Sequence, residues 1–432
     1  MTATTEQASR SRRLVGGTGL LTIAWFISFL EGYDLAIYGV SIPSIMADES
    51  LHLSLPAAGV VGSLVGVGML VGAAFAGATS HRFGQLRLIR WSIAVFSFGM
   101  LLSAVAPSAA LFGGGRLITG LGLGVVLPTV NAYVADLSSP GRVARNVGLV
   151  MSGYAIGALC APVLASVLLE VSFRWLYVIG LVPALLLLPV LKVLPNSPAQ
   201  LRVHGRIREA ELIETHYGLP EPKLLGTSRP GRFFGLGALL ARGVWRSTLL
   251  FWVMSFCGLL LVFGISAWLP TMLQASGYSL GSALLQTAAM WLGVAVGVIV
   301  GGRVADVIGP KTVVVAAFTV GTLGLCAMSL QPALWVFYIL MFVSGFGFIG
   351  SQILGNALIA TRYPPELRGN GLPWALSIGR LGAIAGPALG AWVLASSLPT
   401  AWNFYAFAVP ALVGATAALL VPRVKSEPAP VK

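Results

Sequence analysis

The stretch Gly77-Ala-Thr-Ser-His-Arg-Phe-Gly84 returns 225 residues later as Gly302-Arg-Val-Ala-Asp-Val-Ile-Gly309, with both pairs of end glycines in one register. Two further places keep this offset: Gly157-Ala-Leu-Cys-Ala-Pro162 matches Gly382-Ala-Ile-Ala-Gly-Pro387, and Pro140 matches Pro365. Single glycine matches are common in a chain with 53 glycines, but one register shared by three separated places is not. The sequence therefore predicts two related halves.

The chain around these motifs is strongly apolar. Hydrophobic residues make up 56% of it and charged residues only 9%, whereas an average soluble domain is about 25% charged. Such a surface cannot face water all round, so we expect it to lie in a lipid bilayer. A bilayer core about 30 Å thick needs roughly 20 apolar residues per helix. Twelve runs qualify: 17–43, 57–79, 88–106, 110–135, 146–169, 173–194, 247–273, 281–304, 310–329, 333–360, 370–396 and 400–422.

These runs define an all-α membrane protein of 12 transmembrane helices in two pseudo-symmetric six-helix bundles. We expect the bundles at 17–194 and 247–422 and a linker at 195–246. An N-tail (1–16) and a C-tail (423–432) complete the chain. Within the linker, the segment 196–232 is expected to form one or two amphipathic helices.

The positions of the basic residues orient the spans. Of the 27 lysines and arginines, only Arg174 lies at the side opposite the termini, and only Arg116 and Arg380 lie well inside spans rather than at or beyond their ends. All others lie in the tails, the linker or the connectors on the same side as the termini. Positive residues favour the cytoplasmic side, so both termini are predicted to be cytoplasmic in a multi-pass protein of the inner (plasma) membrane.

Composition also bears on other classes of function. The net charge of +13 comes from short connectors, without the basic, aromatic-interleaved surface that indicates nucleic-acid binding. The three cysteines show neither metal-ligand nor disulfide spacing, and the linker lacks a phosphate-binding glycine motif. We therefore expect no nucleic acid, no metal, no cofactor and no ATP-driven step.

Four charged residues lie well inside the spans: Glu31, Asp34, Arg116 and Arg380. Charges at membrane depth are costly and usually face a cavity. Glu31 and Asp34 are three residues apart and share a helix face, so mutual repulsion favours a proton on one of them. A guanidinium such as Arg380 can grip a carboxylate with two hydrogen bonds. The alternative is that the four charges simply neutralise one another between helices.

Several motifs resemble a known family. The two glycine-bounded connectors and Arg116-Leu-Ile-Thr-Gly-Leu-Gly-Leu-Gly124 are similar to motifs of the major facilitator superfamily. Glu31-Gly-Tyr-Asp34 resembles the Asp-Gly-Tyr-Asp signature of the aromatic acid:proton symporters, with glutamate in place of the first aspartate. Ser377-Ile-Gly-Arg380-Leu-Gly-Ala-Ile-Ala-Gly-Pro387 also resembles that family.

This resemblance implies two parallel halves with the substrate site between them, near the membrane midplane. It also implies a proton-coupled importer of a small aromatic carboxylate of the benzoate or hydroxybenzoate class, and no enzyme. The predicted partners are the acid, protons and lipid, and we expect a monomer. Asp34, followed by Glu31, is the predicted proton-coupling group. Predicted substrate-binding residues are Arg380, Arg116, Tyr33, Tyr38, Asn131, Gln352, Asn356 and Trp374, with Tyr154 and Trp291 as further aromatic candidates.

Charged residues at the inner ends of the spans are predicted to form a gate. Opposite charges there can hold the two halves together when the inner side closes. The predicted gate consists of Arg82, Asp136, Arg142, Asp306 and Arg368. The alternative is that they only add to the positive charge of the cytoplasmic side.

Two rival functions remain. One is a proton-coupled antiporter that exports drugs or metabolites, which should carry a complete glycine-proline motif in the fifth span. Here Ala161 precedes Pro162, and Ala165-Ser166 stands where two glycines are expected, which favours import. The other is a membrane enzyme or channel, but the spans contain no evident nucleophile–base pair or metal cluster.

Transport is expected to depend on the proton gradient, because the paired carboxylates can carry a proton and no nucleotide motif is present. Uptake of a labelled aromatic acid should stop when a protonophore is added and continue when sodium is omitted. Uptake that survives the protonophore and requires sodium would refute this prediction.

Overall fold

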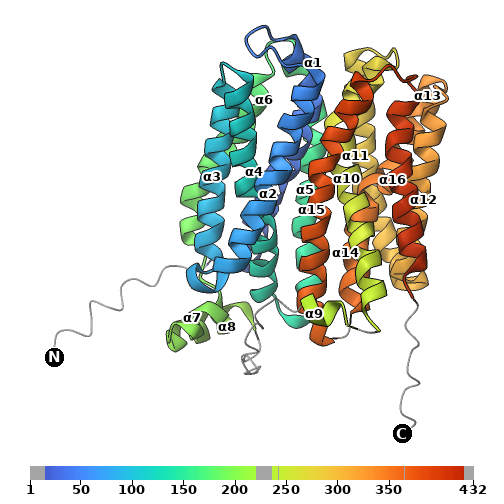
Figure 1. The fold of residues 1–432 in the computed structure, drawn as a ribbon. Helices are drawn as coiled ribbons and strands as arrows, with labels where there is room; N and C mark the ends of the chain where they lie inside the picture. The colour runs from blue at the N-terminus through green and yellow to red at the C-terminus, as the bar shows by residue number, and fades with distance from the viewer. Residues whose placement is uncertain (1–14, 220–235, 242, 364, 423–432) are drawn as a thin grey trace, which may run out of the picture.

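The computed structural model describes residues 15–219, 236–241, 243–363 and 365–422. Within these ranges, twelve helical spans are long and apolar enough to cross a membrane, which confirms the predicted number. The first half contains α1 (Gly17–Ala47), α2 (Leu55–Phe83), α3 (Gln85–Val105), α4 (Ala109–Asp136), α5 (Val143–Leu168) and α6 (Arg174–Val190). The second contains α10 (Trp245–Ala275), α11 (Leu280–Ile308), α12 (Pro310–Met328), α13 (Leu334–Gly345), α14 (Ser351–Arg362), α15 (Pro365–Ala395) and α16 (Trp402–Leu420) (Figure 1).

The repeated motif marks the same sharp turn in both halves. Gly84 ends α2 and precedes α3 with φ 80°, and Gly309 ends α11 and precedes α12 with φ 91°. Such positive φ angles suit glycine, which has no side chain to clash with the backbone. The register of the sequence repeat therefore corresponds to a backbone conformation that each half needs once.

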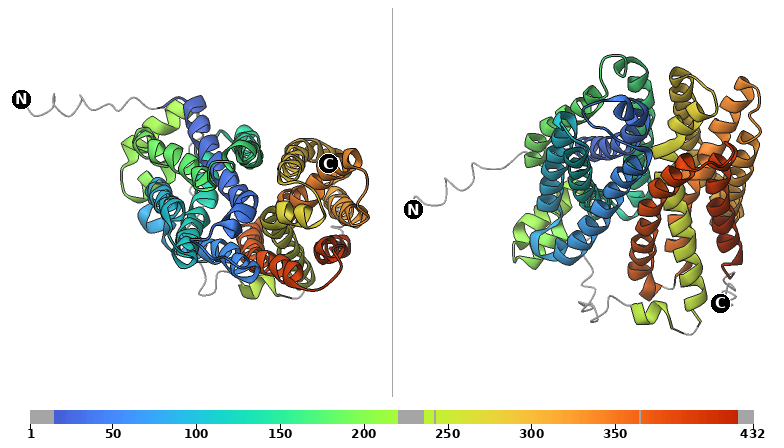
Figure 2. Two further views of the ribbon diagram at one scale, coloured as in Figure 1. Left: turned by 90° about the horizontal axis from the view of Figure 1, so that it is seen from above. Right: turned by 45° about the horizontal axis from the view of Figure 1, so that its top comes forward.

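The helices segregate into two bundles, which stand side by side in Figure 2. In the first, α1 packs on α5, and α4 packs on α2 and α3; in the second, α10 packs on α15 and α12 on α16. Contact between the bundles runs through the pairs α2–α15, α5–α11 and α1–α10. These six helices therefore form the boundary between the bundles.

Small residues let the two bundles touch on the side away from the termini. We call the end where α1 begins and α16 finishes the terminal end, and the other the opposite end. A Cβ atom at Gly39 of α1 would lie 1.8 Å from the Ser266 carbonyl oxygen, and one at Gly59 of α2 would lie 2.3 Å from the Ala391 side chain. The Ser63 hydroxyl donates to the Ile384 carbonyl across the same seam at 2.7 Å. These contacts lie toward the opposite end.

The linker helices lie at the terminal end. The structure has α7 (Pro198–Val203) and α8 (Ile207–Tyr217) in the segment expected to form amphipathic helices, followed by α9 (Leu236–Leu239). Residues 220–235, between α8 and α9, lie outside the described residues. Arg202 and Glu214 join α7 to α8 through hydrogen bonds of 2.9 and 2.6 Å. The Tyr217 hydroxyl donates to the Val15 carbonyl at 2.6 Å, so α8 is attached to the start of the first bundle.

Two predicted spans differ from the structure in detail. The run 333–360 is not one regular helix, because a π-helical turn at Phe346–Gly350 joins α13 to α14. Gly347 in this turn packs against the backbone of Gly321, and such close contact can shift the helical register. The run 370–396 is longer than expected: α15 begins at Pro365, a residue type suited to the first turn of a helix.

Gly157 allows α5 to lie against α1, since a Cβ atom there would meet the Phe29 carbonyl oxygen at 1.9 Å. Gly157→Ala should therefore lower the free energy of unfolding by about 1–3 kcal/mol, the usual cost of overpacking. The measurement is thermal unfolding of the detergent-purified protein. Gly148→Ala on the same helix is the matched control, because a Cβ atom there meets nothing within 4 Å. Equal melting temperatures for the two variants would contradict the prediction.

Candidate functional site

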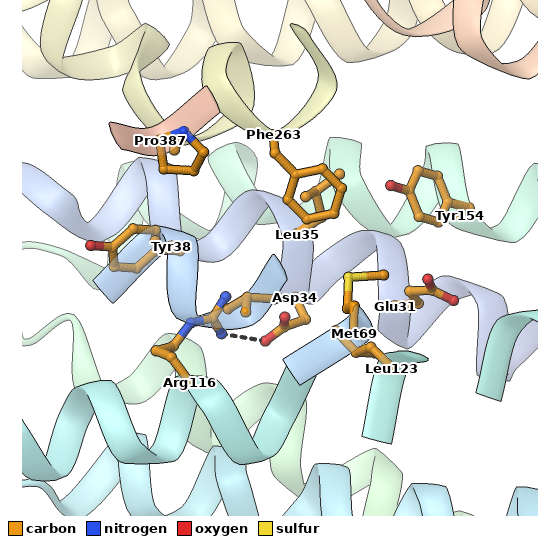
Figure 3. Close-up of a pocket in the computed structure, with 13 residues that line it drawn as sticks. Glu31, Asp34, Leu35, Tyr38, Met69, Arg116, Leu123, Tyr154, Phe263 and Pro387 are labelled. Atoms are coloured by element: carbon orange, nitrogen blue, oxygen red, sulfur yellow. Dashed lines mark hydrogen bonds and ion pairs between the residues drawn. The ribbon is translucent and has the colours of Figure 1, made fainter. Parts of the chain in front are cut away.

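A small cavity lies where the two bundles face each other. Both bundles contribute to its wall (Figure 3). Its lining combines three charged groups with aromatic and aliphatic side chains. The lining residues are Glu31, Asp34, Leu35, Tyr38, Gly62, Val65, Met69, Arg116, Leu123, Tyr154, Phe263, Ala267 and Pro387.

The Glu31-Gly-Tyr-Asp34 motif is placed by a close helix contact. A Cβ atom at Gly32 would lie 1.8 Å from the Tyr154 carbonyl oxygen, so only glycine lets α1 approach α5 this closely. The Tyr33 hydroxyl donates to the Leu176 carbonyl of α6 at 2.9 Å and fixes the helix on its other side. The two middle residues of the motif thus position α1, and the two outer residues bring carboxylates to the cavity.

Asp34 forms an ion pair with Arg116 inside the first bundle. Arg116 Nη1 lies 2.6 Å from Asp34 Oδ1, and the side chains of Arg116 and Asp34 are 2% and 0% exposed, respectively. The guanidinium carbon also lies 5.3 Å from the centroid of the Tyr38 ring and 6.0 Å from that of Tyr177, distances at which aromatic rings attract cations. Arg116 is therefore held by one carboxylate and two rings.

Glu31 is buried, with 3% of its surface exposed, but its surroundings differ from those of Asp34. It forms no ion pair among the described residues, and its Oε2 atom, like Asp34 Oδ2, has no hydrogen-bond partner there. The cation that acts on it electrostatically is Arg380 of α15, in the other bundle, although no direct ion pair joins these two residues. Arg380 instead donates from Nη1 to the Met69 carbonyl of α2 at 2.6 Å.

Aromatic side chains cover much of the remaining wall. Tyr38 donates its hydroxyl to the Ala58 carbonyl at 2.5 Å, so its ring has a fixed position. Tyr154 of α5 lies edge-on to Trp291 of α11, with ring centroids 6.4 Å apart across the two bundles. Phe263 of α10 adds a third ring from the second bundle. A planar apolar ligand could contact rings from both bundles.

Other predicted binding residues lie elsewhere among the described residues. Tyr33 contacts α6, and Asn131 Nδ2 lies 3.6 Å from Met151 Sδ within the first bundle. Gln352 donates to Asn356 Oδ1 at 2.9 Å on α14. Trp374 of α15 lies beside Trp252 of α10, with ring centroids 6.3 Å apart. None of these four sites borders the cavity, so in this conformation they take no part in its wall.

Eight lining residues are not among the predicted binding residues: Leu35, Gly62, Val65, Met69, Leu123, Phe263, Ala267 and Pro387. All lie within apolar spans, where most such residues face lipid or other helices. Leu123 and Pro387 fall within motifs quoted from the sequence, and the other six have no distinctive signal there. Their place in the wall follows from how the bundles meet.

The predicted gate residues lie at the terminal end without forming a latch. Asp136 accepts hydrogen bonds from Gln85 Nε2 at 3.0 Å and Ser197 Oγ at 2.9 Å, both from its own side of the molecule. Arg82, Arg142 and Asp306 are exposed, and no ion pair joins any of these four described residues to another. The side chain of Arg368 lies outside the described residues.

The described residues hold no cluster of three or more histidine, cysteine, aspartate or glutamate side chains suited to a metal. The three cysteines are free thiols. The cavity is lined by two carboxylates, the Arg116 guanidinium and aromatic and aliphatic side chains, groups that can bind an anion, stack on a ring and take up a proton. Arg380 is not among the lining residues.

Comparison with known proteins agrees with this arrangement. A gentisate transporter from Corynebacterium glutamicum is 34% identical over 96% of this chain and 93% of its own length. A benzoate transport protein from Acinetobacter baylyi is 31% identical over 93% of this chain and 89% of its own length. A xylose transporter from E. coli, solved in a partially occluded inward open conformation, has the same fold, with a TM-score of 0.73 at 18% identity over 95% of this chain and 100% of that one.

The family model of the Major Facilitator Superfamily matches residues 24–290 and 282–432, nearly the whole chain. Together with the relatives, this match confirms the resemblance that the sequence motifs indicated. The repeat, the twelve spans and the cavity between two bundles are the features expected of such a transporter. The chain belongs to the Major Facilitator Superfamily.

Proposed function

We propose that this protein imports small aromatic carboxylates together with protons by alternating access. The observation that carries the proposal is the cavity itself: it lies between the two bundles and combines buried carboxylates, a buried arginine and rings from both sides. The relatives named for gentisate and benzoate transport support the substrate class. Both named compounds are planar aromatic rings with a carboxylate, which matches this lining.

The substrate ring is proposed to lie between Tyr38, Tyr154 and Phe263. Aromatic rings prefer offset or edge-on contacts with other rings, and these three side chains belong to α1, α5 and α10. Because they come from both bundles, a ring held among them links the bundles. Closure around the substrate then changes contacts on both sides at once.

The substrate carboxylate is proposed to bind Arg380. Asp34 already neutralises Arg116, whereas Arg380 donates to a backbone carbonyl and has no direct carboxylate partner among the described residues. A carboxylate is a stronger acceptor than a carbonyl for a guanidinium. An incoming carboxylate would therefore form a stronger new interaction with Arg380 than with Arg116.

The terminal end is proposed to face the cytoplasm, as the excess of positive residues there favours. The contacts through Gly39, Gly59 and Ser63 then seal the outer side. The unlatched state of Arg82, Asp136, Arg142 and Asp306 fits an inner side that is not closed. We propose that these residues approach one another when the carrier turns outward.

Export of drugs by antiport is not favoured. Its motif in the fifth span is incomplete, with Ala161 before Pro162, and the two relatives described above are named for single aromatic acids. The lining also combines aromatic rings with charged groups, which suits an anionic aromatic ligand.

Purified protein in liposomes should take up gentisate and benzoate saturably, and much less of the uncharged benzamide, because the amide cannot neutralise Arg380. The measurement is radiolabelled uptake with the acid outside and a more alkaline interior. Protein-free liposomes report the passive entry of protonated acid and are subtracted. Equal uptake of benzamide and benzoate, or no protein-dependent uptake of either acid, would contradict the proposed function.

Arg380→Lys should weaken acid binding about ten- to a hundredfold. Lysine keeps the charge but loses the planar two-donor fork, and one charge-assisted hydrogen bond is worth roughly 1.5–3 kcal/mol. Equilibrium binding to the purified variant is the measurement, with Arg303→Lys at an exposed position of α11 as the matched control. If Arg380→Lys and Arg380→Ala both bind the acid as tightly as wild type, Arg380 is only a structural partner of Met69, and the anion site must be sought around Arg116.

A further inference from the structure

The two carboxylates of α1 have different kinds of partner. Asp34 is paired at 2.6 Å with Arg116 of α4, and both helices belong to the first bundle. When bundles move as rigid bodies, a contact within one bundle is preserved. The Asp34–Arg116 pair therefore persists through a rocking motion, and breaking it would leave a charge buried without a partner, at a cost of several kcal/mol.

Glu31 faces the boundary between the bundles. The charged and titratable groups that act on it are Arg380 of α15, Asp34 on its own helix and Tyr154 of α5. Only Arg380 belongs to the second bundle, so this is the interaction that changes when the bundles move. Glu31 Oε2 and Asp34 Oδ2 both lack a hydrogen-bond partner among the described residues, but only Asp34 has an ion-pair partner, so the Glu31 carboxylate is the one left without a direct cation in this conformation.

Side-chain length fits this difference. A glutamate reaches about 1.5 Å farther than an aspartate, the length of one additional carbon–carbon bond. Both carboxylates line the cavity between the bundles. The extra length gives the Glu31 carboxylate more reach toward the second bundle, whereas the Asp34 carboxylate is paired with Arg116 of its own bundle.

We propose that Glu31, and not Asp34, carries the coupled proton, and that Glu31 and the substrate carboxylate alternate as the partner of Arg380. The Asp34–Arg116 pair is a fixed element that holds α1 against α4. This proposal rests on the proposed function and reverses the order of the two carboxylates expected from the sequence motif.

The exchange balances in charge and protons. A proton from outside binds the Glu31 carboxylate and makes it neutral, which leaves Arg380 available to an incoming aromatic carboxylate. After the carrier opens inward, the proton leaves Glu31 for the cytoplasm, and the restored carboxylate competes with the substrate for Arg380 and favours its release. Proton and anion binding thus promote each other, as a reciprocal coupling requires.

Separating exchange from accumulation tests this role. With a gradient of about one pH unit, one coupled proton supports about tenfold accumulation, because each tenfold ratio corresponds to 1.4 kcal/mol. In protein liposomes, Glu31→Gln should retain exchange of labelled for unlabelled gentisate and lose this protein-dependent accumulation. The matched control is Glu49→Gln, at an exposed position in the connector after α1, which should accumulate gentisate as wild type does. Accumulation by Glu31→Gln at the wild-type level would overturn the proposal.

A second measurement needs no substrate and so remains decisive if gentisate is not transported. Infrared difference spectra between acidic and alkaline pH show the C=O stretch of a carboxyl group that gains a proton. This band should disappear in Glu31→Gln and persist in Asp34→Asn. If the unpaired Arg116 prevents the Asp34→Asn variant from folding, the double variant Asp34→Asn with Arg116→Gln takes its place. A band that persists without Glu31 and disappears without Asp34 would show that Asp34 carries the proton.

Discussion

The arrangement of the cavity depends on the ion pair between Asp34 and Arg116. Asp34 Oδ1 lies 2.6 Å from Arg116 Nη1, and both side chains have almost no exposed surface. A single charge at membrane depth is costly, so each partner keeps the other buried. Tyr38 and Tyr177 complete the surroundings of the guanidinium. Because the pair fixes α1 against α4, it also fixes where Glu31, one helical turn away, meets the second bundle.

Glycine makes this geometry accessible at several points. Gly32 brings α1 against the backbone of α5, and Gly157 does the same from the side of α5. Gly39 and Gly59 allow contact with the second bundle. Between apolar helices in lipid there is little hydrophobic driving force, so close packing of small residues supplies much of the attraction.

The two ends of the molecule are held together by different means. At the opposite end, backbone and small side chains of α2 and α15 meet directly, with the hydrogen bond from Ser63 to Ile384 across the seam. At the terminal end, Asp136 is engaged by Gln85 and by Ser197, just before α7, within its own side of the molecule. Ser197 thus connects the start of the linker helices to the end of α4.

The sequence by itself determined the twelve spans, the two related halves and the four charges buried within them, because hydropathy, repeat register and the rarity of charge in lipid are local properties of the chain. It also indicated the family, through motifs whose glycines serve tight turns and close contacts. Only the tertiary structure decided that Asp34 pairs with Arg116, that Arg380 reaches Met69, and that Phe263 and Pro387 border the cavity. Those facts depend on how helices distant in sequence rotate and meet, and apolar residues carry no sequence mark of which neighbour they face.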